Sequence, residues 1–368
     1  MPMSQIAFHQ TVLQFLEPIR DYLLDEDVSE ILMNGYDEIY IEKRGRLLKT
    51  ERKFSSSDSF MAAIRNVSQY VGRIIDETKP YMDARLPDGS RVHAMIPPCA
   101  VRGPYMAIRK FSKMLLKMDD LIAVGTIDRR ITDFLNACVR MRKSIIVSGG
   151  TGSGKSTLLN VISNFIPNDE RIIVIEEASE LQLQQAHVLP METRKADKKG
   201  LSEVTVRDLV ACSLRLRPDR IIVGECRGGE ALDMLQAMNT GHSGSMSTLH
   251  ANSTKDSLNR LETMALMSDV VMPLTAIRGQ IASAVDLIIQ MSRFADGSRR
   301  ITEIMEIEGL NNEGNYLIRS LFVYALQGKD EASGKIRGSL KPTGTKPSFF
   351  SELSFYDLQM VPELFSSV

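Results

Sequence analysis

The chain has 368 residues, which is more than one ordinary hydrophobic core supports and predicts two domains. A net charge of −1 gives no overall attraction to nucleic acid or to an acidic membrane. No apolar run approaches the length of a bilayer span, and residues 1–30 lack a signal-peptide core. The four cysteines form no C-x-x-C pair, so we expect a reduced, cytoplasmic protein without a zinc site.

The first 111 residues predict a small α+β domain. Apolar spacing favours helices within residues 1–25 and over residues 58–75. Between them, residues 28–54 show short strand-like runs that Asn-Gly and Arg-Gly turns interrupt. A hairpin is expected over residues 83–97, because a Pro-Asp-Gly sequence within it is a strong turn signal.

From residue 128 to residue 326, short apolar strands alternate with amphipathic helices. Strands are predicted over residues 143–148, 171–175, 220–224 and 245–250. Fully apolar strands between helices indicate a parallel sheet covered on both faces, so the fold class expected here is a doubly wound, RecA-like α/β domain. Residues 286–291 and 301–308 are expected to close this domain as a strand pair around an Asp-Gly turn.

Two segments fall outside the predicted domains. Residues 112–127 are interpreted as a linker between them. Residues 327–368 are rich in Gly, Ser, Lys and Pro, so they are expected to form a loosely packed carboxy-terminal extension.

A phosphate-binding motif follows the first strand of the α/β domain. The sequence GGTGSGKS matches G-x-x-x-x-G-K-[ST] between an apolar strand and a helix, which makes a chance match improbable. Its glycines let successive backbone N–H groups face a phosphate, beside the positive end of the helix dipole. Lys155 is expected to reach the β- and γ-phosphates of ATP, and the Ser156 hydroxyl to ligate Mg²⁺. The predicted ATP-binding residues are Gly149, Gly150, Thr151, Gly152, Ser153, Gly154, Lys155, Ser156 and Thr157.

Two acidic residues follow later strands of the same domain. Glu176 ends one apolar strand and Glu225 follows another. A single acid at a strand end is as often a solvated turn residue, but in a doubly wound sheet these two ends meet at the nucleotide crevice. We therefore expect Glu225 to hold the Mg²⁺ shell and Glu176 to orient or deprotonate the attacking water.

Histidines are concentrated in one short segment. Gly241 and Gly244 permit tight turns on either side of His242, and His250 ends the strand that follows. We expect these turns to bring His242 near the phosphates, where a neutral imidazole senses the γ-phosphate. The alternative is a histidine with a purely structural hydrogen bond.

Several longer segments resemble one family. They are Ser148–Asn160 (SGGTGSGKSTLLN), Ile175–Gln185 (IEEASELQLQQ), Leu214–Gly229 (LRLRPDRIIVGECRGG), Glu230–Asn252 (EALDMLQAMNTGHSGSMSTLHAN), Arg85–Pro98 (RLPDGSRVHAMIPP) and Gly338–Phe365. Together they are similar to the secretion ATPase superfamily of type II and type IV secretion, and most similar to its Tad/CpaF-type pilus assembly ATPases.

The resemblance implies a hexameric ring of P-loop ATPases with Mg-ATP bound between the two domains of a subunit. It implies that arginines of the first domain approach the γ-phosphate, which nominates Arg91, Arg102 and Arg109, and it adds Arg227, which follows soon after Glu225. The family has a short acidic motif, the acidic box, which is often Glu-Asp. This chain has Glu176-Glu177 at that place, so the role of Glu177 is open.

The function expected from this resemblance is a motor that hydrolyses ATP to power pilus assembly or protein secretion. The implied location is the bacterial cytoplasm, in peripheral contact with an inner-membrane platform protein and without direct nucleic-acid binding. Two alternatives remain open at this point: a RecA-like nucleic-acid translocase and a nucleotide-gated scaffold that does not hydrolyse ATP.

Overall fold

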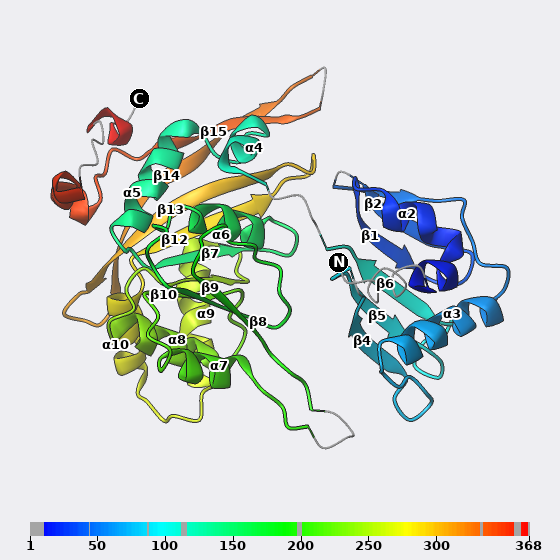
Figure 1. Cartoon of the computed structure of the whole chain (residues 1–368). Helices are drawn as coiled ribbons and strands as arrows, with labels where there is room; N and C mark the ends of the chain where they lie inside the picture. Colours follow the sequence, from blue (N-terminus) through cyan, green and yellow to red (C-terminus); the bar gives the residue numbers. More distant parts are fainter. Residues whose placement is uncertain are drawn as a thin grey trace. The chain divides into compact units, whose positions relative to one another are not determined.

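The computed structural model divides the chain into two compact units, residues 1–115 and 116–368, each of which is described by itself (Figure 1). The described residues are 11–43, 45–86, 88–111, 116–196, 201–331, 334–356 and 362–366.

The first unit is built on an antiparallel sheet with the strand order β3-β2-β1-β6-β5-β4. Its strands are β1 (Val28–Met33), β2 (Ile39–Lys43), β3 (Arg46–Lys49), β4 (Tyr81–Arg85), β5 (Arg91–Met95) and β6 (Tyr105–Arg109). The helical segments include η1 (Glu17–Ile19), α2 (Arg20–Leu24) and α3 (Ser57–Tyr70).

Helix α3 covers one face of this sheet. It begins after Ser56, whose side chain accepts a hydrogen bond from the backbone N–H of Ser59. Its residues Phe60 and Ile64 are buried in the same core as Ile31 of β1. The predicted hairpin is present as β4 and β5, while residues 1–10, Arg44 and Pro87 of the predicted elements lie outside the described residues.

The second unit contains a mixed sheet with the strand order β15-β14-β13-β12-β7-β11-β10-β8-β9. Its strands are β7 (Ile145–Gly149), β8 (Ile172–Glu176), β9 (Val188–Glu192), β10 (Arg220–Val223), β11 (Met246–Leu249), β12 (Leu287–Arg293), β13 (Arg299–Leu310), β14 (Tyr316–Lys329) and β15 (Ile336–Pro342). The strands from β12 to β9 run parallel, and β13, β14 and β15 add to them antiparallel.

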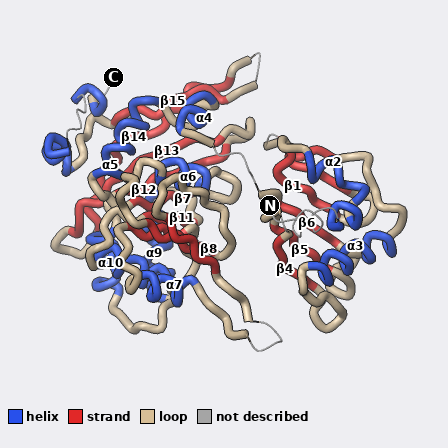
Figure 2. Tube along the Cα trace, in the orientation of Figure 1, coloured by secondary structure: helices blue, strands red, loops and turns tan. Residues whose placement is uncertain are grey.

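Helices cover both faces of the sheet (Figure 2). They are α4 (Met118–Ala123), α5 (Arg129–Arg140), α6 (Lys155–Ser163), α7 (Val206–Ser213), α8 (Glu230–Asn239), α9 (Thr254–Leu266) and α10 (Leu274–Ala284). Successive residues of β7 alternate between two cores, with Ile145 and Val147 packed beside α5 and α6 and Ile146 packed beside α8 and α9. The predicted doubly wound α/β domain is thereby confirmed.

The predicted linker is wrong over its described part. Residues 116–127 belong to the second unit, because α4 lies there and Leu121 and Ile127 are buried in its core. Leu121 is the buried residue of this six-residue helix, so the segment is too short to show the apolar periodicity that marks a longer helix.

The predicted loose extension is also wrong where the structure describes it. β15 pairs with β14, and Ser348 donates its backbone N–H to the buried carboxylate of Glu306 at 3.0 Å. Phe349 and Phe365 are buried against Phe134 of α5, with ring centroids 6.4 and 5.7 Å from it. A few widely spaced aromatic residues therefore dock a tail whose composition is otherwise typical of loops.

Candidate active site

The phosphate loop connects β7 to α6, as its motif predicts. Gly152 and Gly154 have positive φ angles of 69° and 96°, which residues with a side chain rarely adopt. Gly149 lies so close to β12 that a Cβ atom there would be 2.4 Å from the carbonyl oxygen of Met291. The glycines thus allow both the curl of the loop and its close packing against the neighbouring strand.

Lys155 is held at the centre of the loop. Its side chain is buried, and its Nζ donates to the carbonyl oxygen of Gly150 at 3.0 Å. Gly154 is the N-cap of α6, and no side chain caps this helix end. The N–H groups of the first turn are therefore available to an anion, and Ser156 and Thr157 lie in that turn.

A chain of polar contacts joins the loop to the ends of β10 and β11. Lys155 Nζ lies 3.4 Å from His250 Nδ1, and His250 Nε2 lies 2.6 Å from Glu225 Oε1. Glu225 Oε2 in turn accepts bonds from Arg227 Nε at 3.0 Å and from its terminal nitrogen at 2.6 Å. Arg227 also pairs with Glu177 at 2.7 Å, so the second acid of the box binds an arginine here.

The environment of His250 favours a neutral imidazole ring between Lys155 and Glu225. Burial lowers the pKa of His250, and the nearby cations of Lys155, Arg227 and Arg260 lower it further, although Glu225 opposes them. With Nδ1 accepting from Lys155, the proton is on Nε2, which lies in close contact with Glu225 Oε1 without a hydrogen bond between the two atoms. The ring therefore orients the cation and the carboxylate together.

Glu176 is buried at the end of β8, and its carboxylate accepts bonds from backbone N–H groups. Oε1 lies 2.9 Å from the nitrogen of Glu180 and 3.1 Å from that of Leu181. A Cβ atom on Gly224 would be only 2.8 Å from Glu176 Cγ, so the absent side chain at that position makes room for the acid. These contacts show Glu176 anchoring the loop that follows it.

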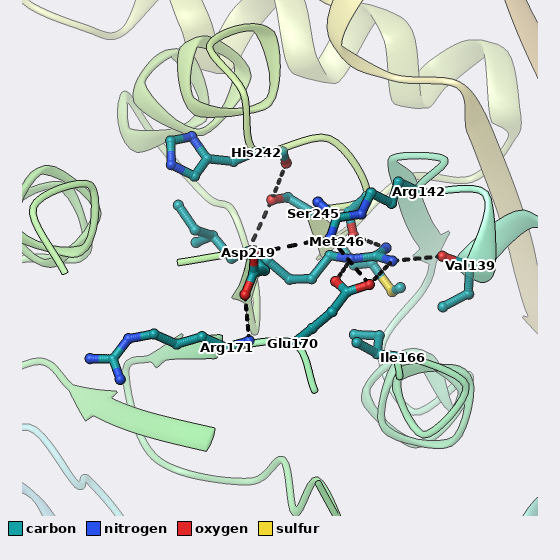
Figure 3. A network of polar contacts seen from close by, with 12 residues as sticks. Val139, Arg142, Ile166, Glu170, Arg171, Asp219, His242, Ser245 and Met246 are labelled. Carbon is teal, nitrogen blue, oxygen red and sulfur yellow. Dashed lines mark hydrogen bonds and ion pairs between the residues drawn. The ribbon is translucent and has the colours of Figure 1, made fainter. Parts of the chain in front are cut away.

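The predicted position of His242 is wrong. This residue precedes β11, whereas the phosphate loop and His250 lie at the carboxyl ends of β7 and β11, which run parallel. Its Nδ1 lies 3.1 Å from the carbonyl oxygen of Ala237, and its own carbonyl accepts from Ser245. Figure 3 shows it joined through its carbonyl oxygen to Ser245, in the polar network that also contains Glu170 and Asp219, which precede β8 and β10. His242 therefore lies at the amino-terminal ends of the parallel strands, and the phosphate loop lies at their carboxyl ends.

The three candidate arginines of the first unit fall into two groups. Arg91 of β5 and Arg109 of β6 are directly paired. Arg85 of β4 is in turn paired with Arg91, so Arg85, Arg91 and Arg109 form a row across neighbouring strands. The row continues to Glu30 of β1, which is paired with Arg109, so an acidic residue stands at one end of it. Arg102 is exposed in the turn before β6, where its backbone N–H donates to the Tyr105 hydroxyl at 3.2 Å.

Two residues near the phosphate loop were missed as site candidates. His250 was noted without a role, although its place directly after a parallel strand is the signal that selects it. Arg299 of β13 donates its Nε to the carbonyl oxygen of Gly152 at 2.9 Å. No local motif marks Arg299, because it is far from the loop in the sequence.

The residues present fit a nucleoside triphosphate and Mg²⁺. The glycine-rich turn, the start of α6 without a side-chain cap and the buried Lys155 form an anion site, and Ser156 and Glu225 carry oxygen atoms of the kind that Mg²⁺ prefers. No helix within the described residues is long and apolar enough to cross a membrane.

The fold and this site define a doubly wound α/β protein of the phosphate-loop type. A family model of type II/IV secretion system proteins matches residues 14–320. The chain therefore belongs to the type II/IV secretion system protein family, and the predicted membership of the type II and type IV secretion superfamily is confirmed. The particular similarity to the Tad/CpaF type stays a prediction.

Individual relatives agree with this assignment. The type IV secretion system protein PtlH of Bordetella pertussis is 33% identical, over 83% of this chain and 96% of the relative. The conjugal transfer protein TrbB of Rhizobium radiobacter is 31% identical, over 84% of this chain and 94% of the relative. The crystal structure of the pilus retraction motor PilT with bound ADP is similar in fold, with a TM-score of 0.55 and 18% identity, covering 97% of this chain and 90% of PilT.

Proposed function

We propose that this chain binds Mg-ATP at the phosphate loop and hydrolyses it as one subunit of a ring-forming motor that powers pilus assembly or protein secretion. The observation that carries the proposal is the contact chain from Lys155 through His250 to Glu225. It joins the phosphate-binding cation to the acid that follows β10, across the strand that separates them in the sheet.

Each residue of the site has a definite task in this proposal. Residues 150–157 supply backbone N–H groups to the phosphates, and Lys155 binds the β- and γ-phosphate oxygens. Ser156 and Glu225 hold Mg²⁺, which, when bound, neutralises charge on the phosphates. His250 lies between Lys155 and Glu225 and fixes their separation. Arg227 balances the charges of Glu225 and Glu177.

The role of Glu176 changes from the one expected. Because its carboxylate accepts from the backbone of Glu180 and Leu181, we assign it to positioning the loop beside the site. Of the three candidate arginines we propose Arg91 and Arg109 for the γ-phosphate, because they form a direct cross-strand pair, whereas Arg102 lies in an exposed turn. An arginine supplied in this way stabilises the charge of the transition state.

The remaining parts of the proposal concern the assembly. Arginines that reach the nucleotide from a second unit couple hydrolysis to the movement of that unit, which is what a motor requires. The named relatives belong to conjugal transfer and type IV secretion systems, and PilT is a pilus motor. We propose a hexameric ring that contacts a platform protein peripherally at the inner membrane.

The proposal is tested by steady-state Mg-ATP hydrolysis over a protein dilution series, with light scattering on the same samples. A ring motor predicts specific activity that rises together with molar mass, and no activity above background for Lys155→Ala. Turnover that is stimulated by DNA favours the translocase. ATP binding without hydrolysis, in every assembly state and with the platform partner added, overturns the motor and favours a scaffold.

A further inference from the structure

The hairpin formed by β12 and β13 lies directly against the phosphate loop. Met291 of β12 is paired with Gly149 of the loop, at the point where a Cβ atom on Gly149 would be 2.4 Å from the Met291 carbonyl oxygen. The turn is tight, because Phe294 and Ser298 are joined by a backbone hydrogen bond of 2.8 Å. The start of β13 is thereby brought beside the tip of the loop.

Arg299, the first residue of β13, covers the outer side of that tip. Its Nε donates to the Gly152 carbonyl oxygen at 2.9 Å, and its Cδ lies 3.3 Å from where a Cβ atom on Gly154 would be. The contact thus spans residues 152–154, which lie between the strand and the first turn of α6.

This bond fixes the direction of the next N–H group. In a planar trans peptide the carbonyl of Gly152 and the N–H of Ser153 point in opposite directions. With the oxygen held by Arg299, the Ser153 N–H points to the opposite side, where it donates to the Gly150 oxygen at 3.4 Å and closes the turn of the loop. Backbone N–H groups aimed inward are what a phosphate loop uses to bind the β-phosphate.

We propose that Arg299 is a positioning residue for nucleotide binding, which holds the phosphate loop through Gly152 in the shape that accepts the β-phosphate of a nucleoside di- or triphosphate. The inference rests on the proposed nucleotide site. Because Arg299 acts on the loop and has no assigned contact with the γ-phosphate, it contributes equally to the binding of ADP and of ATP.

The adjacent Arg300 provides a matched control. It also donates to backbone carbonyl oxygens, those of Val124 at 3.2 Å and of Gly125, but these belong to the connection between α4 and α5. Arg299 and Arg300 therefore share a strand, a charge and a type of acceptor, and differ in whether the acceptor is in the phosphate loop.

The test is equilibrium binding of fluorescent ADP and ATP analogues to the full chain. Arg299→Ala is expected to raise both dissociation constants by about tenfold, the effect of one charge-assisted hydrogen bond. Its KM for ATP rises by a similar factor, while kcat stays within about twofold. Arg300→Ala is expected to leave both affinities within about twofold, and the melting temperatures of the two variants are compared.

A further variant separates geometry from charge. Arg299→Lys keeps the positive charge but has carbon in place of Nε, so weakened binding is expected here too, and this variant carries the test if Arg299→Ala does not fold. Affinity like that of the wild type in both Arg299 variants overturns the inference, as does equal weakening in Arg299→Ala and Arg300→Ala. A loss for ATP alone also overturns it. A wild-type chain that binds neither nucleotide refutes the proposed function and this inference with it.

Discussion

His250 Nε2 lies 2.6 Å from Glu225 Oε1, so a histidine that follows β11 is in close contact with the acid that follows the neighbouring strand β10. On its other side the same ring faces Lys155 Nζ at 3.4 Å. One neutral imidazole thus lies between the cation and the carboxylate of the proposed ATP site.

Replacing this histidine is expected to impair hydrolysis strongly. His250→Ala removes a partner from both Lys155 and Glu225, a loss of about 2 kcal/mol that lowers kcat/KM by about 30-fold. His242→Ala is the matched control and is expected to stay within about twofold of the wild type. Steady-state phosphate release measures both, and equal losses in the two variants would contradict the position assigned to His242.

Gly224 is expected to be intolerant of a methyl group because Glu176 occupies the space beside it. Gly224→Ala places a Cβ atom 2.8 Å from Glu176 Cγ and is expected to cost about 1–3 kcal/mol in the free energy of unfolding. Gly279→Ala, in α10 with no atom within 4 Å of the new Cβ, is expected to be neutral or stabilising by up to about 1 kcal/mol. Urea unfolding measures both, and in a Glu176→Ala background the cost at Gly224 should largely disappear.

Arg220 is expected to be important for stability. Its side chain is fully buried and donates to Glu170 at 2.6 Å, to the Gly244 oxygen at 3.1 Å and to the Val139 oxygen at 2.9 Å. Two of these acceptors, Glu170 and Val139, are labelled in Figure 3. Arg220→Met leaves the Glu170 carboxylate buried without its main partner and is expected to cost about 3–5 kcal/mol in unfolding free energy.

Arg142 is the control for this experiment. Its side chain is 43% exposed and lies 3.4 Å from Glu170, so Arg142→Ala is expected to cost less than about 1 kcal/mol. Chemical unfolding compares the two variants, and a similar small cost for both would show that the buried pair is dispensable.

Asp296, at the turn between β12 and β13, is expected to make stability depend on acid pH. Burial raises the pKa of its carboxyl, but bonds from the N–H of Ile336 and from Ser298 lower it more, from 3.8 to about 2. Since the folded pKa lies below the unfolded one, its stabilisation is present above pH 3.8 and is lost as the pH falls towards about 2.

The corresponding measurement compares wild type with Asp296→Asn. Because this carboxyl lies near the surface, screening reduces its contribution to about 1 kcal/mol. The wild type is therefore expected to lose about 1 kcal/mol more unfolding free energy than Asp296→Asn between about pH 5 and about pH 2. Parallel curves for the two proteins would contradict the assigned pKa.

The parts of the fold that follow from local pattern were predictable. The apolar strand, glycine loop and helix around Lys155 are continuous in the sequence. The strands β9, β14 and β15 were not predicted, because they lie at or near the sheet edges and have few buried residues. With so few buried positions, these strands lack the alternation of apolar and polar residues that marks a half-buried strand in a sequence.

The site was predictable where a topological rule applies. The rule that ligands bind at the carboxyl ends of parallel strands selects Glu225 and His250, and applied strictly it rejects His242, which precedes its strand. Arg299 reaches Gly152 only because the antiparallel hairpin folds back on the phosphate loop. Such a contact depends on tertiary packing and leaves no trace in the local sequence.

The central claim is that Mg-ATP is hydrolysed at the phosphate loop, and phosphate release by wild type and Lys155→Ala tests it most directly. The wild type is expected to turn over Mg-ATP, and Lys155→Ala to lose at least about 100-fold in kcat/KM while remaining folded. Equal phosphate release by the two proteins would contradict the account, because hydrolysis would then take place elsewhere.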